Sequence, residues 1–222
     1  CYKIASFEMT DLNLIRKVAE QGKPMLMSTG MASLEEIAEA VRTARTHGCQ
    51  DIILLKCTSS YPARPEQANL STIPHLRDTF GVHVGLSDHT MGVGVAVAGV
   101  ALGAELIEKH FTLKRSDGGV DSAFSLEPEE LETLVHETHN AWAARGRIFY
   151  GPSDGMEASE KQNRRSLYFV REKHAGSVVE PEDIRSVRPG LGLPVKDYDL
   201  IIGRTLKENV TLGTPTARHL FV

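Results

Sequence analysis

The sequence has few cysteines, no clustered charge of one sign and no long apolar run, and each absence excludes a class of protein. Its three cysteines, Cys1, Cys49 and Cys57, lack the paired spacing of a disulfide framework or a zinc site. No apolar run approaches the roughly 20 residues that a membrane span needs. The net charge of -4 is spread along the chain, which argues against nucleic-acid binding. The composition therefore predicts a globular cytoplasmic protein without a nucleic-acid or membrane partner.

An initiating methionine and a signal peptide are also missing from the sequence. The chain opens at Cys1 and enters a strand-like run, Tyr2 to Ser6, at once. We therefore expect the 222 residues to be part of a longer protein.

Short apolar runs alternate with amphipathic stretches up to about residue 145, which is typical of repeated βα units and a parallel sheet. Ser33 followed by Glu36 has the form of a capping box, so a helix is expected to begin there. The predicted strands are 2–6, 24–28, 51–56, 82–86 and 105–109, and the predicted helices are 11–20, 33–46, 73–79, 92–102 and 128–145.

Five βα units do not close an eight-stranded barrel. We expect a partial TIM (β/α)8 barrel in residues 1–148, a linker in 149–163 and a small β-rich domain in 164–222 with strands at 166–170 and 184–187. About three barrel units would precede Cys1. Because unpaired strand edges invite pairing, the isolated chain is expected to self-associate and to be nearly inactive.

A polar cluster follows each predicted strand, and in a barrel these clusters share the C-terminal rim, where such enzymes build their sites. His89 and His110 are candidate ligands of a divalent metal because imidazole suits such ions. No spacing signature accompanies them, so the alternative is a pair of hydrogen-bonded rim histidines.

Three lysines, Lys3, Lys56 and Lys109, interrupt otherwise apolar strands. With Ser6, Ser28 and Ser87 they could form a concave surface for phosphate and carboxylate groups, or they could pair with Glu8, Asp88 or Glu108. Glu8 is a candidate general base. The loop from Asp117 to Asp121 could bind sugar hydroxyls, provide a second metal contact or be only a turn.

At these rim clusters the chain resembles the sialic acid synthase family, and the resemblance covers essentially the whole chain. The segment Arg115 to Pro128 looks like the pseudaminic acid branch of that family. The segments that carry the resemblance are Tyr2 to Glu8, Gly22 to Pro24, Ser28 to Met31, Cys57 to Pro62, Gly85 to Thr90 and Glu108 to Thr112.

The resemblance implies a partial barrel followed by an antifreeze-like (SAF) domain, and condensation of phosphoenolpyruvate with an open-chain amino sugar. It implies Mn²⁺ or Mg²⁺ on His89 and His110, and Glu8 as the acid/base residue. A domain-swapped homodimer is also implied, in which Arg188 reaches the sugar's acyl group. Tyr61 and Asp121 would contact the sugar, and phosphoenolpyruvate would be held by Lys3, Ser6, Ser28, Ser87 and Ser59, the last at a position where neuraminate enzymes often have Asn.

The neuraminate and legionaminate branches remain alternatives to the pseudaminate branch. A catalytically silent sugar-binding fragment is a third.

Overall fold

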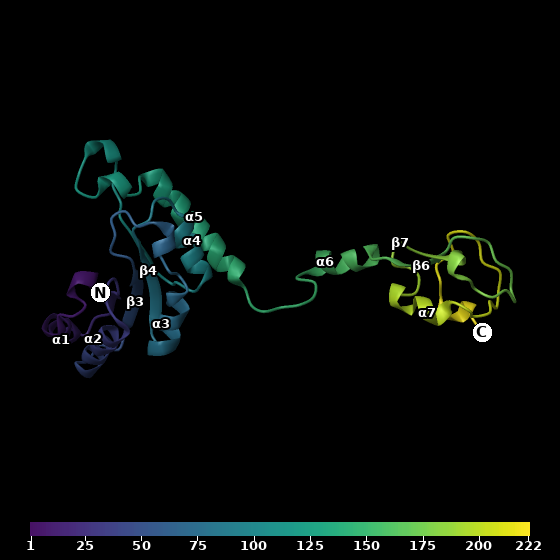
Figure 1. The fold of residues 1–222 in the computed structure, drawn as a ribbon, viewed down its shortest axis with the longest axis horizontal. Helices are drawn as coiled ribbons and strands as arrows, with labels where there is room; N and C mark the ends of the chain where they lie inside the picture. Colours follow the sequence, from purple (N-terminus) through teal and green to yellow (C-terminus); the bar gives the residue numbers. More distant parts are fainter. The chain divides into compact units, whose positions relative to one another are not determined.

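The computed structural model describes residues 1–222 and contains two compact units, Cys1–Arg147 and Ile148–Val222. The order of their elements can be followed along the ribbon in Figure 1. Each unit has its own apolar core.

The first unit is built on one parallel five-stranded sheet in the order β1-β2-β3-β4-β5. Each strand pairs in parallel with the next one along the chain, and parallel neighbours need a crossover connection such as the helices between them provide. The predicted partial barrel is thereby confirmed. The strands are β1 (Tyr2–Ile4), β2 (Met25–Ser28), β3 (Ile52–Cys57), β4 (His83–Asp88) and β5 (Ile107–Lys109).

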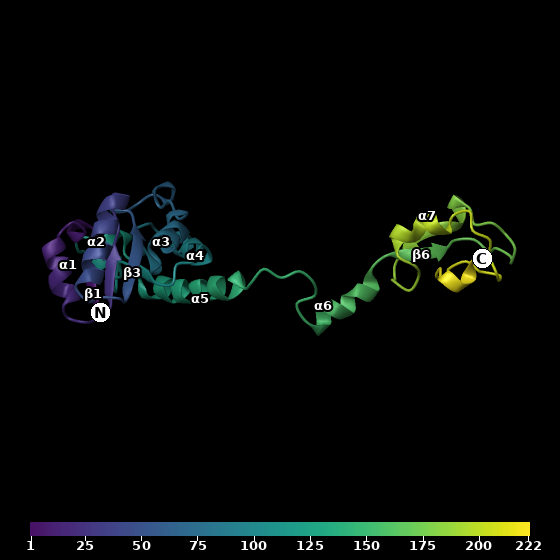
Figure 2. The ribbon, with the colours of Figure 1, turned by 90° about the horizontal axis from the view of Figure 1, so that it is seen from below.

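Helices cover one face of this sheet, as Figures 1 and 2 show for α1 to α4. Ser33 caps α2 as expected: its hydroxyl accepts the Glu36 amide, and the Glu36 carboxylate accepts the Ser33 amide. The helices are α1 (Leu12–Ala19), α2 (Leu34–Thr46), α3 (Thr72–Phe80), α4 (Gly94–Ala101) and α5 (Pro128–Arg145).

Alternate strand residues build the core between sheet and helices. On β3, Ile52 and Leu54 are buried against the helix side chains. Because successive side chains of a strand point to opposite faces, Leu55 and Cys57 point to the other face, the inner face of the barrel arc. Gly99 of α4 lies so close to β4 that a Cβ there would come within 2.9 Å of Leu86 Cδ2, which explains the small residue.

The last helix of the unit, α5, begins at Pro128 with a capping box formed by Glu127 and Glu130. Arg115 ties the loop before it to this helix start, because its guanidinium contacts both carboxylates. Leu134 packs with Ala96 and Leu126 in a small apolar cluster under α5.

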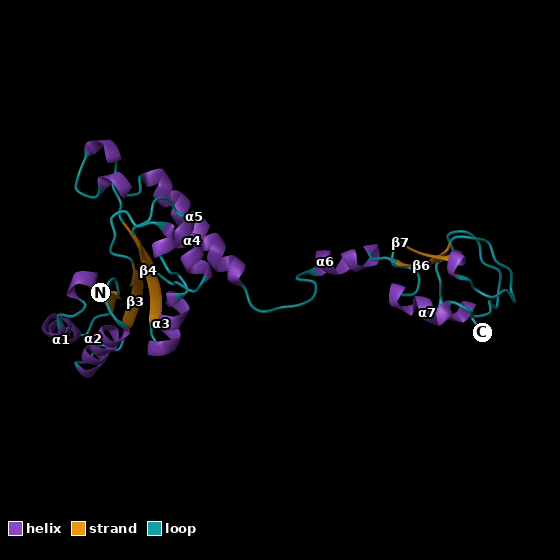
Figure 3. Cartoon of the chain, viewed as in Figure 1, coloured by secondary structure: helices purple, strands orange, loops and turns teal.

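The second unit contains α6 (Gly155–Ser159), α7 (Tyr198–Ile201) and an antiparallel pair, β6 (Ser166–Phe169) and β7 (Ile184–Val187). Loops make up most of the chain beyond α6, as Figure 3 shows. Isolated bridges, such as Val178 with Thr205, extend the pairing. Phe169 and Leu167 lie at the centre of its core. None of the helices in either unit combines the length and apolar composition that crossing a membrane requires.

Candidate active site at the carboxyl ends of the strands

The inner face of the arc carries polar side chains near the carboxyl ends of its strands. Ile4, Met27 and Leu86 are buried on the helix side of the sheet. Because successive side chains of a strand point to opposite faces, the residues next to them in each strand point to the inner face. The inward set is Lys3, Ser28, Cys57, Ser87 and Glu108.

Glu108 connects the inward lysine to the inward serine of β4. Its carboxylate lies 3.6 Å from Lys3 Nζ and accepts a hydrogen bond of 2.6 Å from Ser87 Oγ. Side chains from β1, β4 and β5 thus meet on one surface. Sequence reasoning named Glu108 only as a pairing partner for a lysine. Its neighbours Ile107 and Lys109 point to the helix side of the sheet, so strand alternation was the signal that Glu108 points inward.

Ser6 and Ser59 flank the turn after β2. Ser6 Oγ accepts the Gly30 amide at 3.1 Å. A Cβ on Gly30 would lie 2.3 Å from Ser59 Oγ and 2.7 Å from Ser6 Oγ, so both hydroxyls approach this glycine closely. Only a residue without a side chain leaves room for both hydroxyls.

Ser28 differs from the other hydroxyls because its Oγ is buried and has no hydrogen-bond partner. A buried hydroxyl without a partner costs roughly 1–3 kcal/mol. An unpaired polar atom of this kind is expected where a ligand supplies the missing partner.

The two histidines named from the sequence lie side by side, with ring centroids 5.1 Å apart. His89 Nδ1 lies 2.9 Å from the Thr58 carbonyl oxygen. Since a carbonyl can only accept, Nδ1 carries the proton, and Nε2 is left with the free lone pair of a neutral imidazole. His89 is 7% exposed, whereas the His110 side chain is 31% exposed.

Tyr61 and Asp121 belong to the same group. The Tyr61 ring centroid lies 4.5 Å from that of His89 and 6.0 Å from that of His110, and Asp121 Oδ2 lies 3.7 Å from His110 Nδ1. Phe124, which the sequence did not single out, packs 5.1 Å from His110 and forms an apolar wall. Nothing in its sequence context distinguishes this phenylalanine from an ordinary core residue.

The surroundings shift the pKa values of the two imidazoles in opposite directions. Burial disfavours the charged form of His89, but its bonds to Cys57 and Thr58 outweigh burial and raise its pKa. Burial lowers the pKa of His110, and the charge that His89 carries when it is protonated lowers it further, despite the attraction of Asp121 and Glu108. His110 is therefore the more readily neutral of the two.

Cys57 lies beneath this pair. Its Sγ is 3.9 Å from His89 Nδ1 and 4.0 Å from Ser59 Oγ. Burial opposes ionisation of the thiol, yet contacts with His89, Ser6 and Ser87 lower the pKa of Cys57 to about 7. The sequence indicated no special role for this cysteine.

Two imidazoles in contact fit a divalent ion as a pair of nitrogen ligands. The hydrogen bond from His89 to a backbone carbonyl is the kind of outer support that fixes a ligating imidazole. The chain offers no group of three His, Cys, Asp or Glu side chains around one point. The remaining positions would therefore fall to water and substrate oxygens.

The structure does not bring every named residue into this group. Glu8 lies in a helical turn after β1, half-buried, and its carboxylate makes no hydrogen bond or ion pair. Arg188 follows β7 in the second unit and is exposed.

Two lysines do not join the inner surface. Lys56 lies on the helix-facing side of β3, where its ammonium donates to Cys57 O and Thr58 Oγ1. Lys109 pairs with Asp88 on the helix-facing side of β5. A concave surface of three lysines does not form, because the period-two alternation turns only Lys3 inward. The alternative of carboxylate pairing is confirmed for Lys109 with Asp88 and for Lys3 with Glu108.

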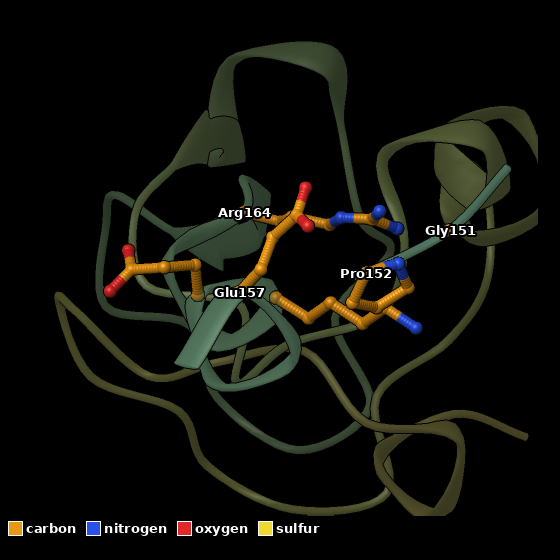
Figure 4. Close-up of a pocket in the computed structure, with 6 residues that line it drawn as sticks. Gly151, Pro152, Glu157 and Arg164 are labelled. Atoms are coloured by element: carbon orange, nitrogen blue, oxygen red, sulfur yellow. The ribbon is translucent and has the colours of Figure 1, made fainter. Parts of the chain in front are cut away.

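A cavity of about 440 Å³ in the second unit is lined by Gly151, Pro152, Glu157, Glu160, Lys161 and Arg164. Figure 4 draws the side chains that line it, and four of them are charged: Glu157, Glu160, Lys161 and Arg164. It contains none of the residues named from the sequence. The site of interest therefore lies on the barrel rim.

The fold and this rim define a class: an α/β-barrel protein with its site at the carboxyl ends of the strands. Residues 1–150 match the NeuB family, and residues 164–215 match the SAF domain. The chain belongs to the NeuB family. The family resemblance and the antifreeze-like domain expected from the motifs are thereby confirmed.

Several curated proteins are similar to this chain. A pseudaminic acid synthase of Campylobacter jejuni is 40% identical over 218 residues, covering 96% of this chain and 62% of the relative. An N,N'-diacetyllegionaminic acid synthase of the same species is 36% identical, covering 94% of this chain and 63% of the relative. The chain thus spans less than two thirds of these curated relatives. The crystal structure of the spore coat polysaccharide biosynthesis protein SpsE of Bacillus subtilis matches 99% of this chain and 67% of its own, with a TM-score of 0.63 and 30% identity.

Proposed function

We propose that this chain carries the rim site of a pseudaminic acid synthase, which condenses phosphoenolpyruvate with 2,4-diacetamido-2,4,6-trideoxy-altrose to a nonulosonic acid and phosphate. The observation that carries the proposal is the contact of two imidazoles beside an inward lysine and serine surface. Identity of 40% to a pseudaminic acid synthase supports the choice of sugar.

Phosphoenolpyruvate would bind to Lys3, Ser6, Ser28 and Ser87, with Ser59 at the edge of the same surface. An ammonium and several hydroxyls suit phosphate and carboxylate oxygens. Ser28 can donate without giving up an existing bond. Ser87 would have to turn away from Glu108, which accepts its proton at 2.6 Å.

His89 and His110 would hold Mn²⁺ or Mg²⁺, which when bound acts as a Lewis acid on the sugar aldehyde. Imidazole ligands favour Mn²⁺ over Mg²⁺, which prefers oxygen. The lowered pKa of His110 keeps its ring neutral and able to ligate. Tyr61 and Asp121, beside these rings, would contact the sugar.

In the reaction, the enol carbon forms a C–C bond to the aldehyde carbon, and the aldehyde oxygen takes up a proton. Water then adds to the former enol C2, and the C2–O bond to phosphate breaks. Glu8 would take the proton from that water, since its carboxylate is not committed to another group. Arg188 would reach the sugar's acyl group from the second subunit of a domain-swapped homodimer.

Phosphate release by the native protein with phosphoenolpyruvate and Mn²⁺ tests the proposal. The altrose should support release, and His89→Ala and His110→Ala should abolish it. Release with N-acetylmannosamine, or with the legionaminate precursor sugar, would instead place the protein in one of those branches. Identity of 36% to a legionaminic acid synthase favours the latter as the second candidate. No release with any sugar would indicate a silent sugar-binding protein.

A further inference from the structure

Behind the two histidines lies a buried ion pair. Lys109 Nζ is 2.7 Å from Asp88 Oδ2, and the two side chains are 4% and 2% exposed. Asp88 directly precedes His89, and Lys109 directly precedes His110. The pair sits on the helix-facing side of the sheet and the imidazoles beyond it at the rim.

Further hydrogen bonds complete this pair. Lys109 Nζ also donates to Thr90 O at 2.6 Å. Asp88 Oδ1 accepts from the Thr90 amide at 2.9 Å and from Thr90 Oγ1 at 2.8 Å. Both charges are thus satisfied entirely by residues at the ends of β4 and β5.

Asp88 and Lys109 are also the last partners in the pairing of β4 with β5. Beyond them the two strands diverge, because Thr90 bridges to Ala63 while Phe111 bridges to Leu126. The ion pair is therefore the last direct tie between the strands before the imidazoles. The bond from His89 to Thr58 fixes the rotation of one ring but leaves the separation of the strand ends free.

A buried ion pair gives little net stability over an apolar pair of similar volume, because desolvation offsets the attraction. Its place directly behind both histidines is what distinguishes this one. We propose that Asp88 and Lys109 are positioning residues that hold His89 and His110 at the separation a divalent metal requires. This inference rests on the metal site of the proposed function.

The test is Mn²⁺ affinity of the native protein without substrates, measured from the electron paramagnetic resonance signal of the free aqua ion. Asp88→Asn and Lys109→Met should each weaken binding about 10-fold to 100-fold, as loss of outer support of metal ligands does. The d–d absorption of bound Co²⁺ should shift in both variants. Lys109→Arg, which keeps the charge, should restore part of the affinity.

Asp183→Asn is the matched control. Asp183 forms a similar ion pair, 2.8 Å from Lys173 Nζ with a side chain 1% exposed, but in the second unit. It should lower stability and leave Mn²⁺ affinity unchanged. Should Lys109→Met not fold by circular dichroism, Asp88→Asn decides, because Asn can still accept both bonds from Thr90.

The outcomes separate the two proposals. Affinity that is lost in His89→Ala but unchanged in Asp88→Asn would overturn the positioning role and leave the metal site standing. Affinity unchanged in His89→Ala and His110→Ala would overturn the metal site and the positioning role with it, whereas phosphate release could still be tested independently.

Discussion

At the scale of single residues, substitution of Ser28 should change protein stability and phosphoenolpyruvate binding in opposite directions. Its Oγ is buried without a partner, so Ser28→Ala removes an unsatisfied group. We expect the variant to be more stable by about 1 kcal/mol. If the hydroxyl binds phosphoenolpyruvate, the variant should bind it about 10-fold to 100-fold more weakly, the loss of one charge-assisted hydrogen bond. Thermal unfolding and titration with phosphoenolpyruvate measure the two effects.

The exposed Ser71, at the start of α3, provides the control for this prediction, and Ser71→Ala should leave phosphoenolpyruvate binding unchanged. Unchanged binding in Ser28→Ala as well would remove this hydroxyl from the proposed site. Reduced stability in Ser28→Ala would show that the hydroxyl has a partner in the folded protein.

Individual side chains were predictable where strand ends could be located. His89 and His110 each follow an apolar run, and the structure brings them into contact. Lys56 was misplaced because the sequence gives strand positions to within a residue or two, and one residue reverses the face to which a side chain points. The contact of Cys57 with His89 could not be predicted, since it joins residues 32 apart in the chain.

At the scale of elements, a buried carboxylate stabilises the turn before β7. Asp183 accepts from Lys173 Nζ at 2.8 Å and from the Glu180 amide at 2.9 Å. Burial opposes its ionisation, but these bonds and the charges of Lys173 and Arg171 prevail and lower the pKa of Asp183. A carboxyl whose pKa is lower in the folded state contributes stability above its unfolded pKa of about 3.9 and loses it as pH falls through the folded value.

We therefore expect Asp183→Asn to lower the free energy of unfolding by about 1–3 kcal/mol at pH 7. The difference from wild type should shrink progressively below about pH 4, where the wild-type carboxylate also becomes protonated. Thermal unfolding of both proteins across this range measures it. Glu182→Gln, a change at an exposed neighbouring carboxylate, serves as the control. A difference that stays constant with pH would show that the charge of Asp183 does not contribute.

The elements themselves followed closely from sequence pattern. Apolar periodicity located all five strands and five helices of the first unit, and the Ser33 capping box marked the start of α2 correctly. The short helix α6 was not expected, because Gly155–Ser159 lies in a polar stretch without apolar periodicity. Its N-cap, Asp154, which accepts the Glu157 amide, was the available local signal.

At the scale of the whole molecule, the sheet of the first unit has two open edges. β1 and β5 each have one neighbouring strand. Unpaired edges present free amides and carbonyls to other chains, so we expect residues 1–222 prepared alone to self-associate. Sedimentation velocity measures this. Tyr2→Lys, which places a charge on the β1 edge, should reduce the association, and a stable monomer at tens of micromolar would contradict the expectation.

The overall architecture could be predicted because each level of evidence agreed: βα alternation, polar strand ends and an abrupt loss of alternation after α5. The bounds of the segment that connects the two units were harder to predict from the sequence. Residues 148–163 belong to the second unit by their contacts, although their composition resembles that of a linker. Packing of Gly190 beside the backbone of Gln162 and Arg164 is a tertiary contact that composition does not reveal.

The fate of the bridging oxygen of phosphoenolpyruvate tests the central claim most directly. The native protein is supplied with Mn²⁺, the altrose and phosphoenolpyruvate carrying ¹⁸O between C2 and phosphorus, and the products are analysed by mass spectrometry. Condensation with C–O cleavage predicts a nonulosonic acid without the label and phosphate that retains it. Unlabelled phosphate, or labelled phosphate formed without any sugar, would contradict the proposed synthase reaction.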